Sequence, residues 1–334
     1  MRKILNVLSV VFLSCLFIAC NPEEEPELVN YASGKGVFIC NEGNYSYGNS
    51  SISFFDPEKK EISNYIFYNA NGFTVGDVCQ SMCIIDSLGF LVINNSGKIL
   101  VINTHTFKHE ATITGLSSPR YMARVSDSLA YVTDLYSPFI SIINVQSFKK
   151  TGEIKVGRST EGIVKKGDFV YVSSWSFQNK VYKINCQSKQ IVDSLTVTKQ
   201  PNSLVIDRNN KLWVLSDGGF QGIPGGQEIA ALTRIEVESF EVEKVFRFQD
   251  ISLSPQRLNI SQRGDLLFFV VGGWKTQIVE NGGVFVMNVN DSELPSQPFI
   301  EQDVRLFYGL GIDPSNSVIY VSDAIDFMQQ GWIF

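Results

Sequence analysis

Aromatic, amide and charged side chains recur in the segments between short apolar runs, and they are the residues whose chemistry could serve a function. Aromatic rings supply contact area, amides supply directed hydrogen bonds, and a few charges add recognition of charged groups. Such a set suits a large, flat ligand with polar edges. The candidate ligand-binding residues are Asn41, Tyr47, Asn95, Arg120, Tyr136, Glu161, Trp175, Phe177, Asn202, Phe220, Gln256, Trp274, Tyr308 and Asp326.

These segments lack the residue patterns of the common catalytic sites. Neither a nucleophile elbow, a Gly-rich phosphate loop nor a run of metal ligands occurs in the sequence. The two histidines, His105 and His109, lie in a turn on the other side of the repeat described below, which removes the commonest general base. Two carboxylates could pair across a channel, although aspartate is also common in turns. The candidates are Asp134, Glu161, Asp217, Asp323 and Asp326. The sequence therefore favours binding without catalysis or a cofactor, and a hydrolase or lyase is the alternative.

The elements that position these residues repeat along the chain. Residues 167–207 contain strand-like runs at 169–174, 181–185, 191–197 and 203–207, separated by polar turns. A period of about 40 residues with four short strands is typical of a β-propeller blade. The sequence therefore predicts an all-β, seven-bladed propeller with four-stranded antiparallel blades. The apolar centre of the first run recurs at Ile39, Val92, Val132, Val172, Val214, Val270 and Val321.

The repeat also predicts which loops share a face. The loop after each anchor strand and the loop before the next innermost strand should open on one face, around a central channel, and these loops hold the candidate residues. The opposite face has polar turns such as residues 57–60 and 187–189. Residues 220–229 and 274–281 lengthen the candidate face, and insertions in repeats commonly serve a site.

The N-terminal segment resembles the signal peptide of a bacterial lipoprotein. Arg2 and Lys3 precede an apolar stretch that ends at Cys20 after a small residue, so residues 1–20 are interpreted as a signal peptide with Cys20 lipidated. Residues 21–30 would form an acidic flexible tether, and residues 31–334 the propeller. A secreted protein with an incidental Cys20 is the alternative. The acidic run is similar to a surface-export signal of Bacteroides-type bacteria, and a solvated spacer would look the same.

Composition excludes some partners. The formal net charge is −6, and the sequence has no cluster of Lys and Arg with interleaved aromatics, so nucleic acid is a poor candidate partner. The cysteines beyond residue 20 are expected to be small buried side chains without disulfides or metal. Cys79 and Cys83, for example, would lie about 13 Å apart along one strand, too far to bridge without a bend.

The end of the sequence falls inside the last repeat. Residues 331–334 match the beginning of a third run, and by the repeat about 25 to 30 residues are absent. The repeat therefore predicts an incomplete last blade, as in a truncated chain, with unpaired strand edges.

Two resemblances extend this interpretation. The YVTD and YVSS motifs, followed by runs such as FISIIN, resemble YVTN/YncE-like propellers over the whole of residues 31–334. The segments GVFICNEGNYSYGNSSISFFD, SSWSFQNKVYKIN, GGVFVMNV and YVSDAIDFMQQGW are similar to the BtuG family of surface lipoproteins. That resemblance implies capture of cobalamin, as a ligand, outside the cell and transfer to the TonB-dependent transporter BtuB. It also implies a lipid-anchored location on the outer membrane. A glycan or a protein as the ligand of the same face is the alternative.

Overall fold

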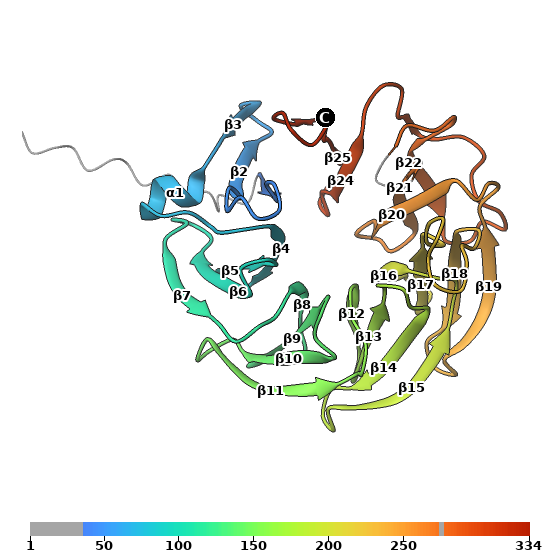
Figure 1. Cartoon of the computed structure of the whole chain (residues 1–334), viewed down its shortest axis with the longest axis horizontal. Helices are drawn as coiled ribbons and strands as arrows, with labels where there is room; N and C mark the ends of the chain where they lie inside the picture. Colours follow the sequence, from blue (N-terminus) through green and yellow to red (C-terminus); the bar gives the residue numbers. More distant parts are fainter. Residues whose placement is uncertain (1–35, 274–276) are drawn as a thin grey trace, which may run out of the picture.

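Seven antiparallel sheets stand in a ring in the computed structural model, which describes residues 36–273 and 277–334 (Figure 1). The predicted all-β, seven-bladed propeller with four-stranded antiparallel blades is therefore confirmed, and among the described residues the first and last blades have three strands. Residues 1–20 with Cys20, the tether at residues 21–30, and Trp274 lie outside the described residues. No helix in the part of the chain that is described is long and apolar enough to span a membrane.

The first blades follow the chain in order. Blade one is β1 (Val37–Asn41), β2 (Ser51–Asp56) and β3 (Glu61–Ser63). Blade two is β4 (Cys79–Ile85), β5 (Leu88–Ile93), β6 (Lys98–Asn103) and β7 (His109–Ile113). Blade three is β8 (Pro119–Arg124), β9 (Leu129–Asp134), β10 (Phe139–Asn144) and β11 (Lys149–Lys155). Blade four is β12 (Ile163–Lys166), β13 (Phe169–Ser174), β14 (Lys180–Asn185) and β15 (Gln190–Thr196).

The remaining blades continue the same order from the inner to the outer strand. Blade five is β16 (Pro201–Ile206), β17 (Lys211–Ser216), β18 (Ala231–Glu236) and β19 (Glu241–Arg247). Blade six is β20 (Leu253–Ile260), β21 (Leu266–Gly273), β22 (Gly283–Asn288) and β23 (Ile300–Glu301). Blade seven is β24 (Phe307–Ile312), β25 (Ile319–Asp323) and β26 (Trp332–Ile333).

The repeat seen in the sequence runs across two blades. Residues 167–207 cover β13, β14 and β15 of blade four and then β16, which is the inner strand of blade five. Apart from Ile39, which lies on β1 and is half-buried, the anchor residues lie on the second strands and are buried. Strands buried on both faces have continuous apolar runs, which is why these strands gave the strongest signal.

The apolar core lies between the blades. Among the described residues, separate clusters of buried side chains fill the junctions between consecutive blades. The junction of blades five and six is rich in aromatic rings, with Trp213 and Phe246 on one sheet and Phe269 on the other. At the junction of blades seven and one, the rings of Phe55 and Tyr320 meet with centroids 6.1 Å apart. The blades are thus held side by side by packing of their faces.

The turn between the third and fourth strands has a recurring polar cap. Asn103, Asn144 and Asn185 each end a third strand, and each side-chain oxygen accepts hydrogen bonds from the N–H groups two and three residues later. Such turns satisfy backbone groups locally, so the outer strand can reverse direction without help from the core. This agrees with the ordinary turn chemistry predicted for this face.

A short helix interrupts the all-β pattern. Helix α1 (Ile66–Asn71) follows β3, and buried Ile66 and Phe67 pack into the cluster between blades one and two. It ends at Gly72, whose φ of 75° is left-handed and whose N–H bonds to the oxygen of Tyr68. This helix was not predicted from the sequence, because six residues are too few to show helical periodicity.

Candidate functional site

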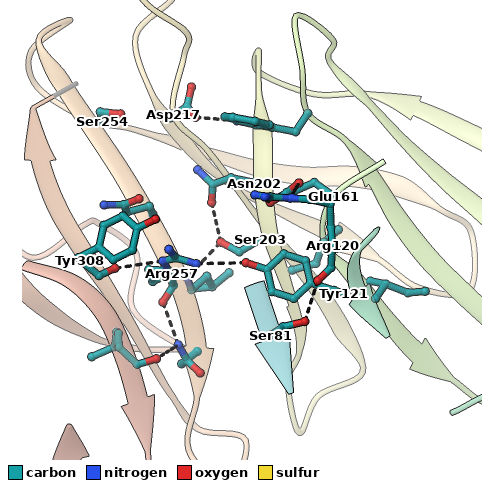
Figure 2. A pocket seen from close by; sticks show the side chains of 18 of the residues that line it. Ser81, Arg120, Tyr121, Glu161, Asn202, Ser203, Asp217, Ser254, Arg257 and Tyr308 are labelled. Atoms are coloured by element: carbon teal, nitrogen blue, oxygen red, sulfur yellow. Dashed lines mark hydrogen bonds and ion pairs between the residues drawn. The ribbon is translucent and has the colours of Figure 1, made fainter. Parts of the chain in front are cut away.

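An open cavity of about 840 Å³ is lined by the inner strands and by loops at one end of the second strands (Figure 2). Its lining comes from blades two to seven, so it is the central channel of the ring. The inner strands β4, β8, β16, β20 and β24 contribute Ser81, Arg120, Asn202, Gln256 and Tyr308. The face predicted from the loops therefore opens onto a cavity large enough for a small molecule.

β-Bulges aim the lining side chains. The pairing between inner and second strands shifts between Cys79 and Ser81, between Pro119 and Met122, and between Pro201 and Ser203. The same shift occurs between Gln256 and Asn259 and between Phe307 and Leu310. A bulge inserts an unpaired residue, bends the strand and redirects a side chain. The residues inside the shifted segments are Gln80, Arg120, Tyr121, Asn202, Arg257, Leu258, Tyr308 and Gly309.

Arg120 and Glu161 form a two-bond ion pair between blades three and four. The Nε and Nη2 atoms of Arg120 donate to Glu161 Oε2 and Oε1, each at 2.7 Å, and its Nη1 donates to Gln80 Oε1. The two side chains are only 15% and 6% exposed. Burial lowers the pKa of Arg120, but the charge and hydrogen bonds of Glu161 raise it by more, so the guanidinium stays charged.

Glu42, Tyr308 and Arg257 form a second polar cluster at the junction of blades seven and one. The hydroxyl of Tyr308 donates to Glu42 Oε2 at 2.6 Å, and Arg257 Nη2 lies 3.7 Å from Glu42 Oε1. The Arg257 guanidinium lies over the Tyr308 ring, 4.8 Å from its centroid. Burial, and then the Glu42 charge, raise the pKa of Tyr308, so its hydroxyl keeps the proton it donates.

Trp175 and Asp217 connect blades four and five at the mouth of the channel. The indole Nε1 of Trp175 donates to Asp217 Oδ2 at 2.9 Å, and Asp217 Oδ1 accepts the Gly219 N–H at 2.8 Å. Burial raises the pKa of Asp217 to about 6, although the hydrogen bond from Trp175 lowers it. Asp217 is thus a turn cap, as the sequence suggested, and also holds the indole in place.

The structure brings six of the predicted ligand-binding residues together and places the others elsewhere. The lining contains Arg120, Glu161, Trp175, Asn202, Gln256 and Tyr308. Tyr47 and Tyr136 are 76% and 70% exposed on the loops. Phe177 and Phe220 pack against each other with centroids 6.2 Å apart. The remaining described candidates make local hydrogen bonds outside the lining, namely Asn41 to Ser51 and Ser53, Asn95 to Asp77, and Asp326 to the N–H groups of Met328 and Gln329.

Several lining residues were absent from the predicted set. Ser81, Tyr121, Ser203 and Arg257 lie on inner strands, and Phe327 comes from the loop after β25. A signal for them existed, because residues two apart on an innermost strand face the same side. The bulges interrupt that alternation, however, so Tyr121 and Arg257 join the lining beside Arg120 and Gln256.

Other titratable groups lie away from the channel. His105 is in the turn between β6 and β7, and His109 begins β7, the outer strand of blade two. Cys40, Cys79, Cys83 and Cys186 are free thiols, of which Cys79 is buried. Within residues 36–273 and 277–334, no group of three or more His, Cys, Asp or Glu could hold a metal ion.

Solved structures with the same fold share little sequence with this chain. A Bacteroides thetaiotaomicron protein, described as a quinonprotein alcohol dehydrogenase-like protein, aligns with a TM-score of 0.65 at 15% identity, over 91% of this chain and 73% of that one. The Pan2 WD40 domain of Neurospora crassa gives 0.62 at 10% identity, over 86% and 82%. Hydrazine synthase of Kuenenia stuttgartiensis gives 0.58 at 18%, over 74% and 73%. Identities this low show the shared fold alone.

Comparison by sequence finds a family but no protein with a curated description. No protein with a curated description matches the chain. Residues 35–328 match the model of a family that is described as "Domain of unknown function (DUF5074)".

Proposed function

The chain belongs to the DUF5074 family, and we propose that it is a non-catalytic binding protein that captures a corrinoid at the loop-bearing mouth of its channel. One observation carries this proposal. Side chains from six blades converge on a cavity of about 840 Å³ and present aromatic rings, amides and guanidinium groups to it. Preformed cavities with a few convergent polar groups bind small molecules at a low cost in ordering.

The lining suits a flat ligand with polar edges. Trp175 and Phe327 offer aromatic surface, and Gln256 offers an amide for directed hydrogen bonds. The Asn202 amide donates to the Pro255 backbone oxygen and accepts from the Ser203 hydroxyl, so it shapes the lining. A corrin ring edged with amide side chains has the matching chemistry. The resemblance to BtuG-type lipoproteins supports the same ligand class. It also supports a lipid anchor at Cys20, a location on the outer membrane, and a BtuB-like transporter as the partner that accepts the ligand.

The carboxylates of the lining support binding without catalysis. Glu161 accepts two hydrogen bonds from Arg120, and Asp217 accepts bonds from Trp175 and Gly219. A nucleophile or general base needs a lone pair within reach of the substrate. Each oxygen of both carboxylates already accepts a hydrogen bond that fixes a neighbouring donor.

Calorimetric titration of the purified protein with cyanocobalamin tests the proposal. We expect saturable binding that is at least about tenfold weaker in Trp175→Ala, because a buried aromatic at a binding site commonly contributes more than 1 kcal/mol. Trp332→Ala is the matched control, since that indole is exposed on β26. A folded wild-type protein that does not bind cyanocobalamin would refute corrinoid capture.

A glycan is the second candidate ligand. The indole of Trp175 is held by Asp217 in the lining, and a fixed aromatic face is a common platform for sugar rings. Titration with neutral oligosaccharides distinguishes the two ligands. Binding of an oligosaccharide that is lost in Trp175→Ala, without binding of cyanocobalamin, would favour the glycan.

A further inference from the structure

The two arginines of the channel differ in how fully their guanidinium groups are occupied. Arg120 uses Nε and Nη2 for Glu161 and Nη1 for Gln80. Three of its five N–H groups therefore donate to neighbouring side chains, and no nitrogen is without a bond. Arg120 holds blades two, three and four together, and its orientation is fixed by Glu161 and Gln80.

Arg257 has donors to spare. Its Nε donates to the backbone oxygen of Tyr308 at 3.0 Å, and its Nη1 donates to the Tyr121 hydroxyl at 3.1 Å. Among the residues that the structure describes, Nη2 has only the ion pair with Glu42 at 3.7 Å, which is too long for a hydrogen bond. Because Nη2 carries two hydrogens, at least two N–H groups of Arg257 are open to another acceptor.

The Tyr121 hydroxyl adds a third donor. Its oxygen accepts from Arg257, so its own proton is available to another group. No acceptor for that proton occurs in residues 36–273 or 277–334. Tyr121 and Arg257 come from blades three and six, and their side chains meet in the cavity (Figure 2). Their bond therefore spans the channel from opposite sides of the ring.

The backbone of Arg257 has a strained conformation that turns its side chain toward the channel. Its φ of 61° is left-handed, a conformation that residues other than glycine seldom adopt. It lies within the β20 bulge, between Gln256 and Asn259, which turns the side chain toward the channel. Strain of this kind persists where neighbouring contacts enforce it.

We propose that Arg257 and Tyr121 form an oxyanion-binding subsite, which takes a phosphate or carboxylate group of the ligand. This inference rests on the proposed function, since it assigns one group of the captured molecule. Guanidinium N–H groups match the geometry of these anions, and the adjacent O–H completes the set of donors. Glu42 does not have to leave, because its other oxygen remains bonded to the Tyr308 hydroxyl at 2.6 Å.

The test compares two corrinoids on two proteins. Cyanocobalamin carries a phosphodiester, and dicyanocobinamide has the corrin ring without it. We expect the wild type to bind cyanocobalamin about 10- to 100-fold more tightly than dicyanocobinamide, as for loss of charge-assisted hydrogen bonds. Arg257→Gln should remove most of that difference and leave the affinity for dicyanocobinamide within about threefold. Arg263→Gln, an exposed arginine on the loop after β20, controls for net charge.

Tyr121→Phe provides a second test of the subsite in case Arg257→Gln does not fold, since it removes one hydroxyl and keeps the ring. We expect it to weaken cyanocobalamin binding about 3- to 10-fold and to leave dicyanocobinamide unaffected. Equal losses for both ligands would overturn the subsite while leaving corrinoid capture intact. Failure of the folded wild type to bind either corrinoid would overturn the proposed function instead.

If the folded wild type binds neither corrinoid, inorganic phosphate tests the oxyanion subsite by itself. At constant ionic strength, saturable quenching of tryptophan fluorescence by phosphate in the wild type and in Arg263→Gln, but not in Arg257→Gln, would support an oxyanion site for another ligand. Absence of a phosphate response in the folded wild type, together with no corrinoid binding, would overturn it.

Discussion

The guanidinium of Arg120 and the carboxylate of Glu161 are joined by two hydrogen bonds of 2.7 Å across the boundary between blades three and four. Thr133 supports the pair, because its hydroxyl donates to the backbone oxygen of Glu161 at 2.7 Å. A buried ion pair costs desolvation of both charges, and it is retained only where the remaining donors and acceptors are satisfied. The pair therefore fixes the spacing of two inner strands at the channel wall.

Glu161→Gln tests this role. The change leaves the buried guanidinium without a counter-charge, so the free energy of unfolding should fall by about 3 kcal/mol. Urea unfolding at pH 7 measures the difference. Glu238→Gln is the matched control, since that residue is exposed, and it should change the value by less than about 0.5 kcal/mol. Similar values for the two variants would mean that the pair contributes nothing to stability.

The fold could be predicted from the sequence because its signal is repeated. Each second strand carries a run such as FVYVSS, which is buried on both faces, and the same run returns with each blade. The Asn cap after the third strand recurs in the same way, as at Asn144 and Asn185. A blade with a weak strand pattern could therefore be recognised from the other blades, whereas helix α1, which occurs once, was missed.

The site could be predicted only in part because its geometry depends on irregularities. Arg120 and Trp175 could be predicted from the loops, because they lie where the strands meet the channel. Tyr136 was also predicted but is exposed to solvent, because composition does not say which side of a loop a side chain takes. Arg257 is aimed by a bulge and a left-handed backbone, and neither feature has a reliable signature in a sequence read without relatives.

Tyr308→Phe should separate the hydroxyl from the ring. The ring keeps its place beneath the Arg257 guanidinium, while Glu42 loses the donor at 2.6 Å. We expect the free energy of unfolding to fall by about 1 to 2 kcal/mol, as for loss of a charge-assisted hydrogen bond. Thermal and urea unfolding measure it. Tyr136→Phe, at an exposed ring, should have no effect, and an equal effect would contradict the assignment.

Gly218→Ala should destabilise the loop that carries Asp217. A Cβ there would lie 2.1 Å from the Glu228 oxygen, and the φ of 79° is left-handed. Backbone must move to relieve that contact, so we expect a loss of about 2 to 4 kcal/mol in the free energy of unfolding. Gly222→Ala shares the left-handed φ, at 89°, but its Cβ meets nothing within 4 Å, and it should cost about 1 kcal/mol. Equal costs would show that strain alone matters.

Asp217→Asn should change how stability depends on pH. Burial raises the pKa of Asp217 from 3.8 to about 6, with the nearby Glu161 charge adding to the rise. Between those values the folded protein keeps a proton that the unfolded chain has lost, so this residue's contribution to stability falls as pH rises. Relative to the wild type, Asp217→Asn should therefore gain about 2 to 3 kcal/mol between pH 4 and pH 8. Urea unfolding at both pH values measures this gain, and Asp127→Asn, at an exposed carboxylate, should show none. If Asp217→Asn gained no more stability than Asp127→Asn, the carboxylate of Asp217 would have an ordinary pKa, as in water.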